Sequence, residues 1–156
     1  DPILCGGAFW DVASYTVSAV FELFPDQEAK VLFSEILFKG DSIVDSSGRA
    51  LLSFSGGASA YLEWGIGVAY KNEIDLWSED GSFYTEKIFS KTSDYVANYY
   101  ERDQNGLQSL ENGKKYEQFT GMFNNFIKIL DNTKELALER RMILGRAKLM
   151  EDILNF

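Results

Sequence analysis

The sequence contains no histidine and only one cysteine, and these absences exclude several kinds of catalytic site. Without histidine the chain cannot form a Ser-His-Asp triad, a Cys-His pair or a histidine-based metal site, and we expect no metal cofactor. Any acid–base chemistry must therefore use carboxylates, tyrosine or lysine. The single cysteine, Cys5, excludes an internal disulfide and indicates a reducing compartment, so we expect a cytoplasmic protein.

Positive charge and long apolar runs are also scarce. The chain has 15 lysines and arginines against 24 aspartates and glutamates, which gives a net charge of −9. A surface of this sign repels nucleic acid, so we expect no nucleic-acid partner. No apolar run approaches the length of about 18 residues that a membrane span needs, and we expect no membrane association.

The length of 156 residues fits one domain that buries a sizeable core. Hydrophobic residues make up 46% of the chain, which is ordinary for a globular protein. We therefore expect residues 1–156 to form a single domain. Because the chain starts with Asp-Pro rather than Met, we also expect it to be part of a longer polypeptide.

The hydrophobic periodicity predicts a helix, then strands, then two helices. The first helix is expected over residues 7–24, with one apolar face made by Trp10, Ala13, Val17, Val20, Phe21 and Phe24. Strand-like patterns follow over residues 31–38, 49–55, 58–70, 74–77, 83–88, 95–102 and 107–110. Hairpin turns are expected at residues 79–81 and 105–106, and a weaker turn at 46–48. Helices are expected over residues 116–130 and 133–154.

This order predicts an α+β fold, in which an open, mainly antiparallel sheet carries helices on one face. The other face must be exposed to water or covered by a partner. A sheet face that is exposed to water rarely carries as many aromatic residues as these strands do: Tyr61, Trp64, Trp77, Tyr84, Tyr99 and Tyr100. We therefore expect a homo-oligomer that forms through this open sheet face.

The run from Gly65 to Tyr70 superficially resembles a dinucleotide-binding loop. It lacks the third glycine, and it joins strand to strand rather than strand to helix, so we interpret it as two glycines in a twisted strand. No phosphate-binding GxxxxGK[ST] motif is present.

Asp11 and Tyr15 are the clearest candidate for a site. They are four residues apart, so a helix places the carboxylate and the phenol on one face. A phenol can exchange a proton with an alcohol or a carbonyl, and a carboxylate can accept a hydrogen bond from a sugar hydroxyl. Gly6 and Gly7 would let the backbone approach a ligand at the helix N-terminus. The spacing alone leaves a second interpretation open, in which the pair belongs to an ordinary solvated helix face.

The first fifteen residues resemble the start of the C-terminal domain in the glucose–fructose oxidoreductase and inositol dehydrogenase family of NAD(P)-dependent sugar oxidoreductases (Gfo/Idh/MocA). In that family a segment like Asp-Pro, a few residues and Gly-Gly-Gly-Ala-Leu-x-Asp-x-x-x-Tyr/His opens the substrate-binding domain. Here the segment reads DPILCGGAFWDVASY, with Cys5 in the place of the first glycine. Asp11 and Tyr15 match the two functional positions in type and spacing. Residues 73–89, 116–130 and the last helix show a weaker likeness.

The resemblance implies the substrate-binding and dimerisation half of an NAD(P)-dependent oxidoreductase that acts on a sugar, a nucleotide sugar or a related polyol. It implies catalytic roles for Asp11 and Tyr15, and substrate binding by Gly6, Gly7, Asp11 and Tyr15. NAD or NADP would be bound by a nucleotide-binding domain that lies N-terminal in the family, so this chain alone would be inactive. The alternative is a non-catalytic ligand-binding or assembly module on the same fold.

Overall fold

The structure is a computed structural model that describes residues 2–156, and Asp1 of the predicted motif lies outside the described residues. Contacts divide the chain into two compact units. The first unit contains the residues up to 68 together with residues 134–156, and the second contains residues 69–133. Each unit is built around its own antiparallel sheet.

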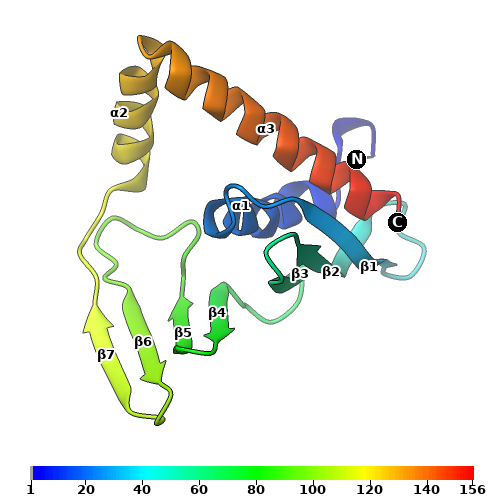
Figure 1. Cartoon of the computed structure of the whole chain (residues 1–156). Helices are drawn as coiled ribbons and strands as arrows, with labels where there is room; N and C mark the ends of the chain where they lie inside the picture. The colour runs from blue at the N-terminus through cyan, green and yellow to red at the C-terminus, as the bar shows by residue number, and fades with distance from the viewer. Residues whose placement is uncertain (1) are drawn as a thin grey trace. The chain divides into compact units, whose positions relative to one another are not determined.

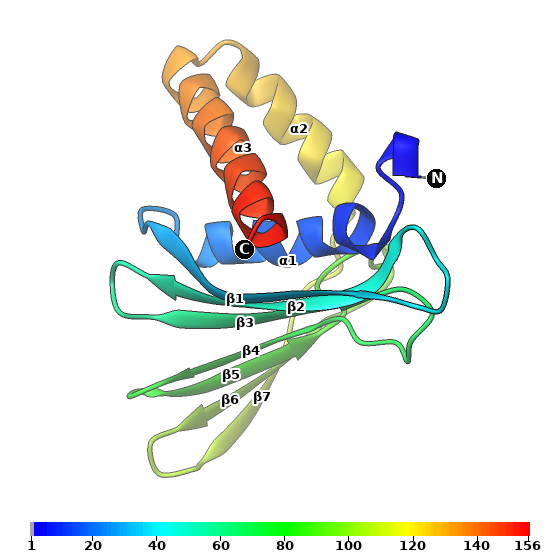
Figure 2. The ribbon, with the colours of Figure 1, turned by 90° about the vertical axis from the view of Figure 1, so that its right-hand side faces the viewer.

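The first unit contains a three-stranded sheet and the helices that cover it. Its elements are η1 (Pro2–Leu4), the π-helix η2 (Phe9–Ala13), α1 (Ser14–Leu23), β1 (Ala29–Phe38), β2 (Asp45–Phe54), β3 (Ser59–Gly65) and, from residue 134 onward, α3 (Thr133–Leu154). The strands are antiparallel in the order β1-β2-β3. The helix formed by η2 and α1 and the last turns of α3 lie on the same face of this sheet (Figure 2).

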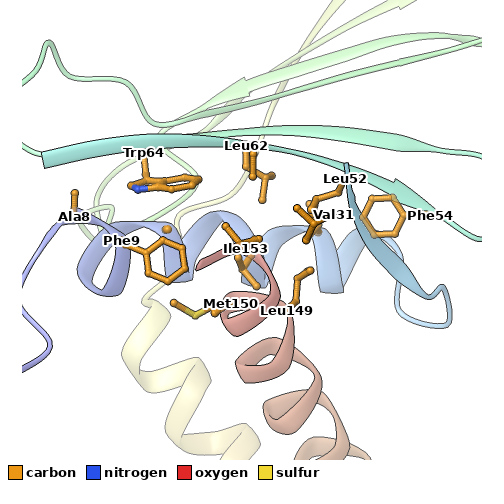
Figure 3. Packing of buried hydrophobic residues seen from close by; sticks show 14 residues of the cluster. Ala8, Phe9, Val31, Leu52, Phe54, Leu62, Trp64, Leu149, Met150 and Ile153 are labelled. Carbon is orange, nitrogen blue, oxygen red and sulfur yellow. The ribbon is translucent and has the colours of Figure 1, made fainter. Parts of the chain in front are cut away.

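The core of the first unit lies between this sheet face and the two helices. Ile153 from the end of α3 lies between the helix and the sheet, close to Leu52 and Leu62 (Figure 3). The buried cluster consists of Ala8, Phe9, Ala13, Val17, Val20, Val31, Ala50, Leu52, Phe54, Leu62, Trp64, Leu149, Met150 and Ile153. The core thus joins the beginning of the chain to residues near position 150.

A β-bulge in β1 decides which of its side chains enter the core. The register with β2 shifts between Val31 and Phe33, so Leu32 is the extra residue. Val31 therefore faces the core together with Ile36, although the two residues differ in parity. Phe33 lies on the opposite face and is exposed.

The weak turn expected at residues 46–48 is wrong. Ser46, Ser47 and Gly48 lie inside β2, and the chain reverses earlier, at residues 39–44. In that loop Ser42 forms short-range hydrogen bonds with Val44, donating to its carbonyl oxygen over 2.7 Å. Gly48 is buried, and the Trp64 ring lies where a side chain at this position would be. The glycine therefore makes room for packing and does not mark a turn.

The expected helix over residues 7–24 is confirmed, but its first turn is a π-helix, and this changes which residue is buried. A π-helix has about 4.4 residues per turn, so side chains four positions apart lie on the same face. Phe9, four positions before Ala13, therefore shares its buried face, and Trp10, three positions before Ala13, does not. Phe9 is accordingly 1% exposed, while Trp10, which was expected on the apolar face, is 43% exposed. Ala13, Val17 and Val20 are buried as expected.

The second unit contains a four-stranded antiparallel sheet and one helix (Figure 1). Its elements are β4 (Glu73–Ser78), β5 (Gly81–Glu86), β6 (Asn98–Asp103), β7 (Gln108–Asn112) and α2 (Gln118–Leu130). Both expected hairpin turns are confirmed, because β4 pairs with β5 across residues 79–80 and β6 pairs with β7 across residues 104–107. Gly106 has a φ of +80°, which glycine adopts readily.

Helix α2 is strongly amphipathic, and its apolar face is exposed. The Glu117 side chain caps it by accepting a hydrogen bond of 2.6 Å from the Thr120 N–H. The exposed apolar residues recur at helical spacing: Phe119, Met122, Phe123, Phe126, Ile127 and Leu130.

The expected α+β class with open antiparallel sheets is confirmed, and the strands are divided between two sheets.

The expected placement of aromatic residues on the open sheet face needs correction at two positions. Trp64 is buried in the core, and Tyr99 lies on the opposite face of its sheet from Tyr84 and Tyr100. That residues 1–156 form one domain remains a prediction.

Candidate functional site

Asp11 and Tyr15 lie on the exposed side of the helix that covers the three-stranded sheet. Asp11 belongs to the π-helical turn and Tyr15 to the first turn of α1, and both side chains are exposed, Tyr15 by 45%. A separation of four residues keeps two side chains on the same side in either helix type. The structure therefore places the expected carboxylate and phenol on one accessible face, opposite the buried Ala13 and Val17.

The N-terminus of this helix is held by Asp45, the first residue of β2. The Phe9 N–H donates a hydrogen bond of 2.7 Å to Asp45 Oδ2. A carboxylate at this place satisfies a free backbone N–H and interacts favourably with the positive end of the helix dipole. The turn that carries Asp11 is thereby attached to the sheet.

Gly7 permits this attachment. It has a φ of +124°, which residues with a side chain rarely adopt, and a Cβ at this position would overlap Asp45 Oδ1. The close backbone approach that Gly7 allows is therefore made by a carboxylate of the same chain. Substrate binding by Gly6 and Gly7 remains a prediction.

Aromatic packing against the sheet also holds the η2 turn in place. The Phe9 and Trp64 rings meet edge to face, with centroids 5.6 Å apart (Figure 3). Trp64 in turn lies over Gly48, where a Cβ would also approach the Glu35 carbonyl oxygen to 2.7 Å. The turn that carries Asp11 thus packs on a buried group made by Phe9, Trp64 and Gly48.

Cys5 adopts a left-handed backbone conformation, with a φ of +54°. This conformation costs a residue with a side chain about 1–2 kcal/mol, whereas glycine adopts it readily. The backbone therefore fits the resemblance, in which glycine occupies this position.

Replacing Cys5 by glycine should stabilise the protein by about 0.5–1 kcal/mol, since part of the strain that is relieved is offset by the greater entropy of the unfolded chain. Cys5 is exposed, so no packing is lost. Denaturant titration would measure the change. Cys5→Ala is the matched control, because alanine keeps the strained φ and should give no gain; equal stabilisation by alanine would contradict the explanation.

Sequence reasoning missed Asp45, Gly48 and Trp64 as supports of the site. Asp45 lies 36 residues from Phe9, and no local pattern links the two positions. A carboxylate at the start of a strand is an ordinary turn residue by sequence. Only the pairing of β1 with β2 brings it to the helix N-terminus.

Residues 65–70 do not form a dinucleotide-binding loop. The run from Gly65 to Tyr70 begins at the last residue of β3 and leads toward β4, so no helix follows to bind a phosphate. Within residues 2–156, no group of three or more acidic or cysteine side chains is arranged to hold a metal ion.

The two concavities on the sheet of the second unit do not include the Asp11 and Tyr15 side chains. The larger has a volume of about 620 Å³. Both are lined in part by Trp77, Ser82 and Arg102.

The chain matches solved structures of oxidoreductases over nearly its whole length. The 3-ketoreductase KijD10 from Actinomadura kijaniata, in complex with NADP, aligns with a TM-score of 0.85 at 21% identity, covering 96% of this chain and 47% of the enzyme. Its open conformation with TDP-benzene and NADP aligns with a TM-score of 0.82 at 22% identity, covering 95% and 46%. The fold is that of a dehydrogenase C-terminal domain.

A third match agrees with this fold. The protein yhhX, described as a probable oxidoreductase, aligns with a TM-score of 0.64 at 15% identity, covering 96% of this chain and 48% of its own. The chain thus spans about half the length of the solved structures that it matches. No protein-family model matches the sequence, and neither does any curated protein. The resemblance noted in the first fifteen residues is confirmed at the level of the fold.

No helix in the described part of the chain is both long and apolar enough to cross a membrane.

Proposed function

We propose that this chain is the substrate-binding half of an NAD(P)-dependent oxidoreductase that acts on a sugar, a nucleotide sugar or a related polyol. One observation carries the proposal: a carboxylate and a phenol lie exposed on one side of a rigidly anchored helix, in a fold shared with an NADP-bound ketoreductase. That enzyme is a 3-ketoreductase crystallised with TDP-benzene, which supports a nucleotide-sugar substrate.

Tyr15 is the proposed proton donor or acceptor. Its hydroxyl would give a proton to a substrate carbonyl oxygen during reduction, and its phenolate would take one from the alcohol during oxidation, while the cofactor would give or take the hydride. Asp11 would accept a hydrogen bond from a neighbouring hydroxyl and so orient the reacting carbon. Gly6 and Gly7 would bind the substrate through their backbone at the start of the helix. The solved structures of the ketoreductase include a tyrosine-to-phenylalanine variant, which is in keeping with such a tyrosine.

The cofactor, NAD or NADP, requires a nucleotide-binding domain in addition to these residues. The chain spans about half of the matched enzymes, and its residues 65–70 do not form a dinucleotide-binding loop. We infer that a second, N-terminal domain binds the cofactor and contributes to the substrate site. The single cysteine is in keeping with a cytoplasmic enzyme.

Replacing Tyr15 by phenylalanine in the intact polypeptide should lower kcat by about 10²-fold or more, because an acid–base group is lost. Asp11→Asn should mainly raise KM, by about 10-fold, since a charge-assisted hydrogen bond to substrate becomes a neutral one. Cofactor absorbance with a panel of sugars and nucleotide sugars measures both constants.

Tyr70→Phe is the matched control, because Tyr70 is an exposed tyrosine that belongs to the second unit. It should leave kcat unchanged. Unchanged turnover in Tyr15→Phe would contradict the catalytic role. Sugar binding without any cofactor-linked turnover in the unaltered protein would favour the alternative, a ligand-binding or assembly module.

A further inference from the structure

The sequence contains two Asn-Gly pairs, and the structure holds them differently. Asn105 and Gly106 lie in the loop between β6 and β7, whereas Asn112 is the last residue of β7 and is followed by Gly113. An asparagine followed by glycine is prone to cyclise, because glycine places no side chain beside the backbone nitrogen that attacks. Whether each pair reacts therefore depends on how that nitrogen is held in the fold.

The first pair lies at the exposed tip of a hairpin. The Gly106 N–H donates to the Asp103 carbonyl oxygen over 3.0 Å, and the Asp103 N–H donates to the Leu107 carbonyl oxygen over 3.1 Å. Together with the φ of +80° at Gly106, these bonds are typical of a hairpin loop in which a type I turn is followed by a left-handed glycine. Residues 103–107 are all exposed, and a Cβ at Gly106 would meet nothing within 4 Å. The Gly106 nitrogen is thus held only by a bond within an open turn.

The second pair belongs to the sheet. The Gly113 N–H donates to the Ala97 carbonyl oxygen over 2.8 Å, which joins the end of β7 to the residue before β6. A Cβ at Gly113 would approach the Tyr99 hydroxyl to 3.0 Å, so this tyrosine lies over the glycine. Asn112 is paired opposite Asn98. Freeing the Gly113 nitrogen therefore requires the β6–β7 pairing to open at this end, which costs more free energy than opening a turn.

We propose that Asn105 is a site of spontaneous deamidation, and that the fold protects Asn112 from the same reaction. The deprotonated backbone nitrogen of Gly106 attacks Cγ of Asn105. The new C–N bond closes a cyclic imide, and the Cγ–Nδ2 bond breaks with release of ammonia. Water then adds to either imide carbonyl and opens the ring, which leaves an aspartate or an isoaspartate. Hydroxide takes the amide proton, so the rate rises with pH above neutrality.

The isoaspartate product would weaken the hairpin tip. Asp103 Oδ1 accepts hydrogen bonds from the Asn105 N–H over 2.9 Å and from the Leu107 N–H over 2.8 Å. Isoaspartate continues the chain through its side-chain carbon, which lengthens the backbone between these two donors and places a new carboxylate beside Asp103. The neighbouring turn is attached to this one, because the Gln104 amide donates a hydrogen bond of 2.8 Å to the Glu79 carbonyl oxygen. The modification should therefore loosen the closed end of the β6–β7 hairpin.

Incubation of the intact polypeptide at mildly alkaline pH tests the site. Trypsin cuts after Arg102 and Lys114, so one peptide carries both pairs, and its fragment masses assign each deamidation to one asparagine. In the folded protein Asn105 should react about 10-fold faster than Asn112 or more, since opening the sheet costs at least one hydrogen bond more than opening the turn. In denaturant the two pairs should react at similar rates, because neither nitrogen is then held.

Equal rates in the folded protein would overturn the proposal. It would equally be overturned if Asn105 stayed intact in the folded protein while the same pair reacted in denaturant. Tyr99→Ala gives a second reading of the protection, because it uncovers Gly113. It should raise the rate at Asn112 and leave the rate at Asn105 unchanged; a folded variant with an unchanged rate at Asn112 would show that Tyr99 does not protect it.

Amide hydrogen exchange measures the effect on the hairpin. In the isoaspartate form the Leu107 and Gln108 amides should exchange about 10-fold faster than in the unaltered protein, since the bonds that close the turn are lost. Asn105→Asp is the matched control, because it adds the charge without lengthening the backbone, and it should stay close to the unaltered protein. Unchanged exchange in the isoaspartate form would remove the effect on the hairpin.

This modification goes beyond the proposed oxidoreductase and does not depend on it. Asn105 belongs to the second unit, whereas Asp11 and Tyr15 belong to the first. Deamidation is measured by mass and turnover by cofactor absorbance, so failure of one proposal is distinguishable from failure of the other.

Discussion

Replacing Gly7 by alanine should destabilise the first unit by about 3 kcal/mol. Two effects add: alanine is strained at a φ of +124°, by about 1–2 kcal/mol, and its Cβ would overlap the Asp45 carboxylate. Displacing that carboxylate breaks its hydrogen bond to the Phe9 N–H, and hydrogen bonds to charged groups contribute about 1.5–3 kcal/mol. Denaturant unfolding followed by tryptophan fluorescence measures the loss.

Two further variants separate these effects. Gly57→Ala is the matched control for backbone strain, because Gly57 has a φ of +90° and its Cβ would meet nothing within 4 Å. It should cost about 1–2 kcal/mol. In an Asp45→Ala background, Gly7→Ala should cost about as little as Gly57→Ala, since the overlap is gone. Equal costs of Gly7→Ala with and without Asp45 would show that the carboxylate is not what Gly7 accommodates.

Ile153→Ala should cost about 3–4 kcal/mol, the second large effect. The Ile153 side chain is 1% exposed and packs between the helix and the three-stranded sheet (Figure 3). Truncation removes buried methyl groups and leaves a cavity that a closely packed core does not fill. For a chain of this length the midpoint of thermal unfolding should fall by about 6–16 °C. Calorimetry measures the midpoint.

Ile143→Ala is the matched control for this variant. It makes the same chemical change in the same helix, at a residue that is 53% exposed. A surface substitution of this kind usually changes stability by no more than about 0.5 kcal/mol. Similar losses for the two variants would mean that helix propensity, not burial, accounts for the effect.

The sequence was sufficient for the features that depend on local patterns. The acid–phenol pair at positions 11 and 15 lies on one exposed helix face because a spacing of four survives the change from π-helix to α-helix. The hairpin around Gly106 formed as predicted because glycine readily adopts the φ of +80° that this turn requires. The catalytic roles of Asp11 and Tyr15 remain predictions.

What the sequence could not predict depends on packing between distant segments. A bulge shifts the parity of a strand by one residue, so alternation alone could not tell that Val31 and Ile36 share the core face. Trp64 and Trp77 look alike in the sequence, yet one is buried because Gly48 on the neighbouring strand makes room for its ring. The Asp45 attachment exists only after β2 has paired with β1.

The position of Ile153 also has a consequence for synthesis of the chain on the ribosome. The helix and the three strands that it covers are complete once residue 65 has emerged, but the side chain that fills the space between them comes 88 residues later. At elongation rates of about 5–20 residues per second, that delay is roughly 4–18 s. During this interval the apolar surfaces that Ile153 will cover remain open to chaperones and to other nascent chains. The buried cluster that includes Phe9 and Trp64 is therefore complete only after residue 153 has emerged.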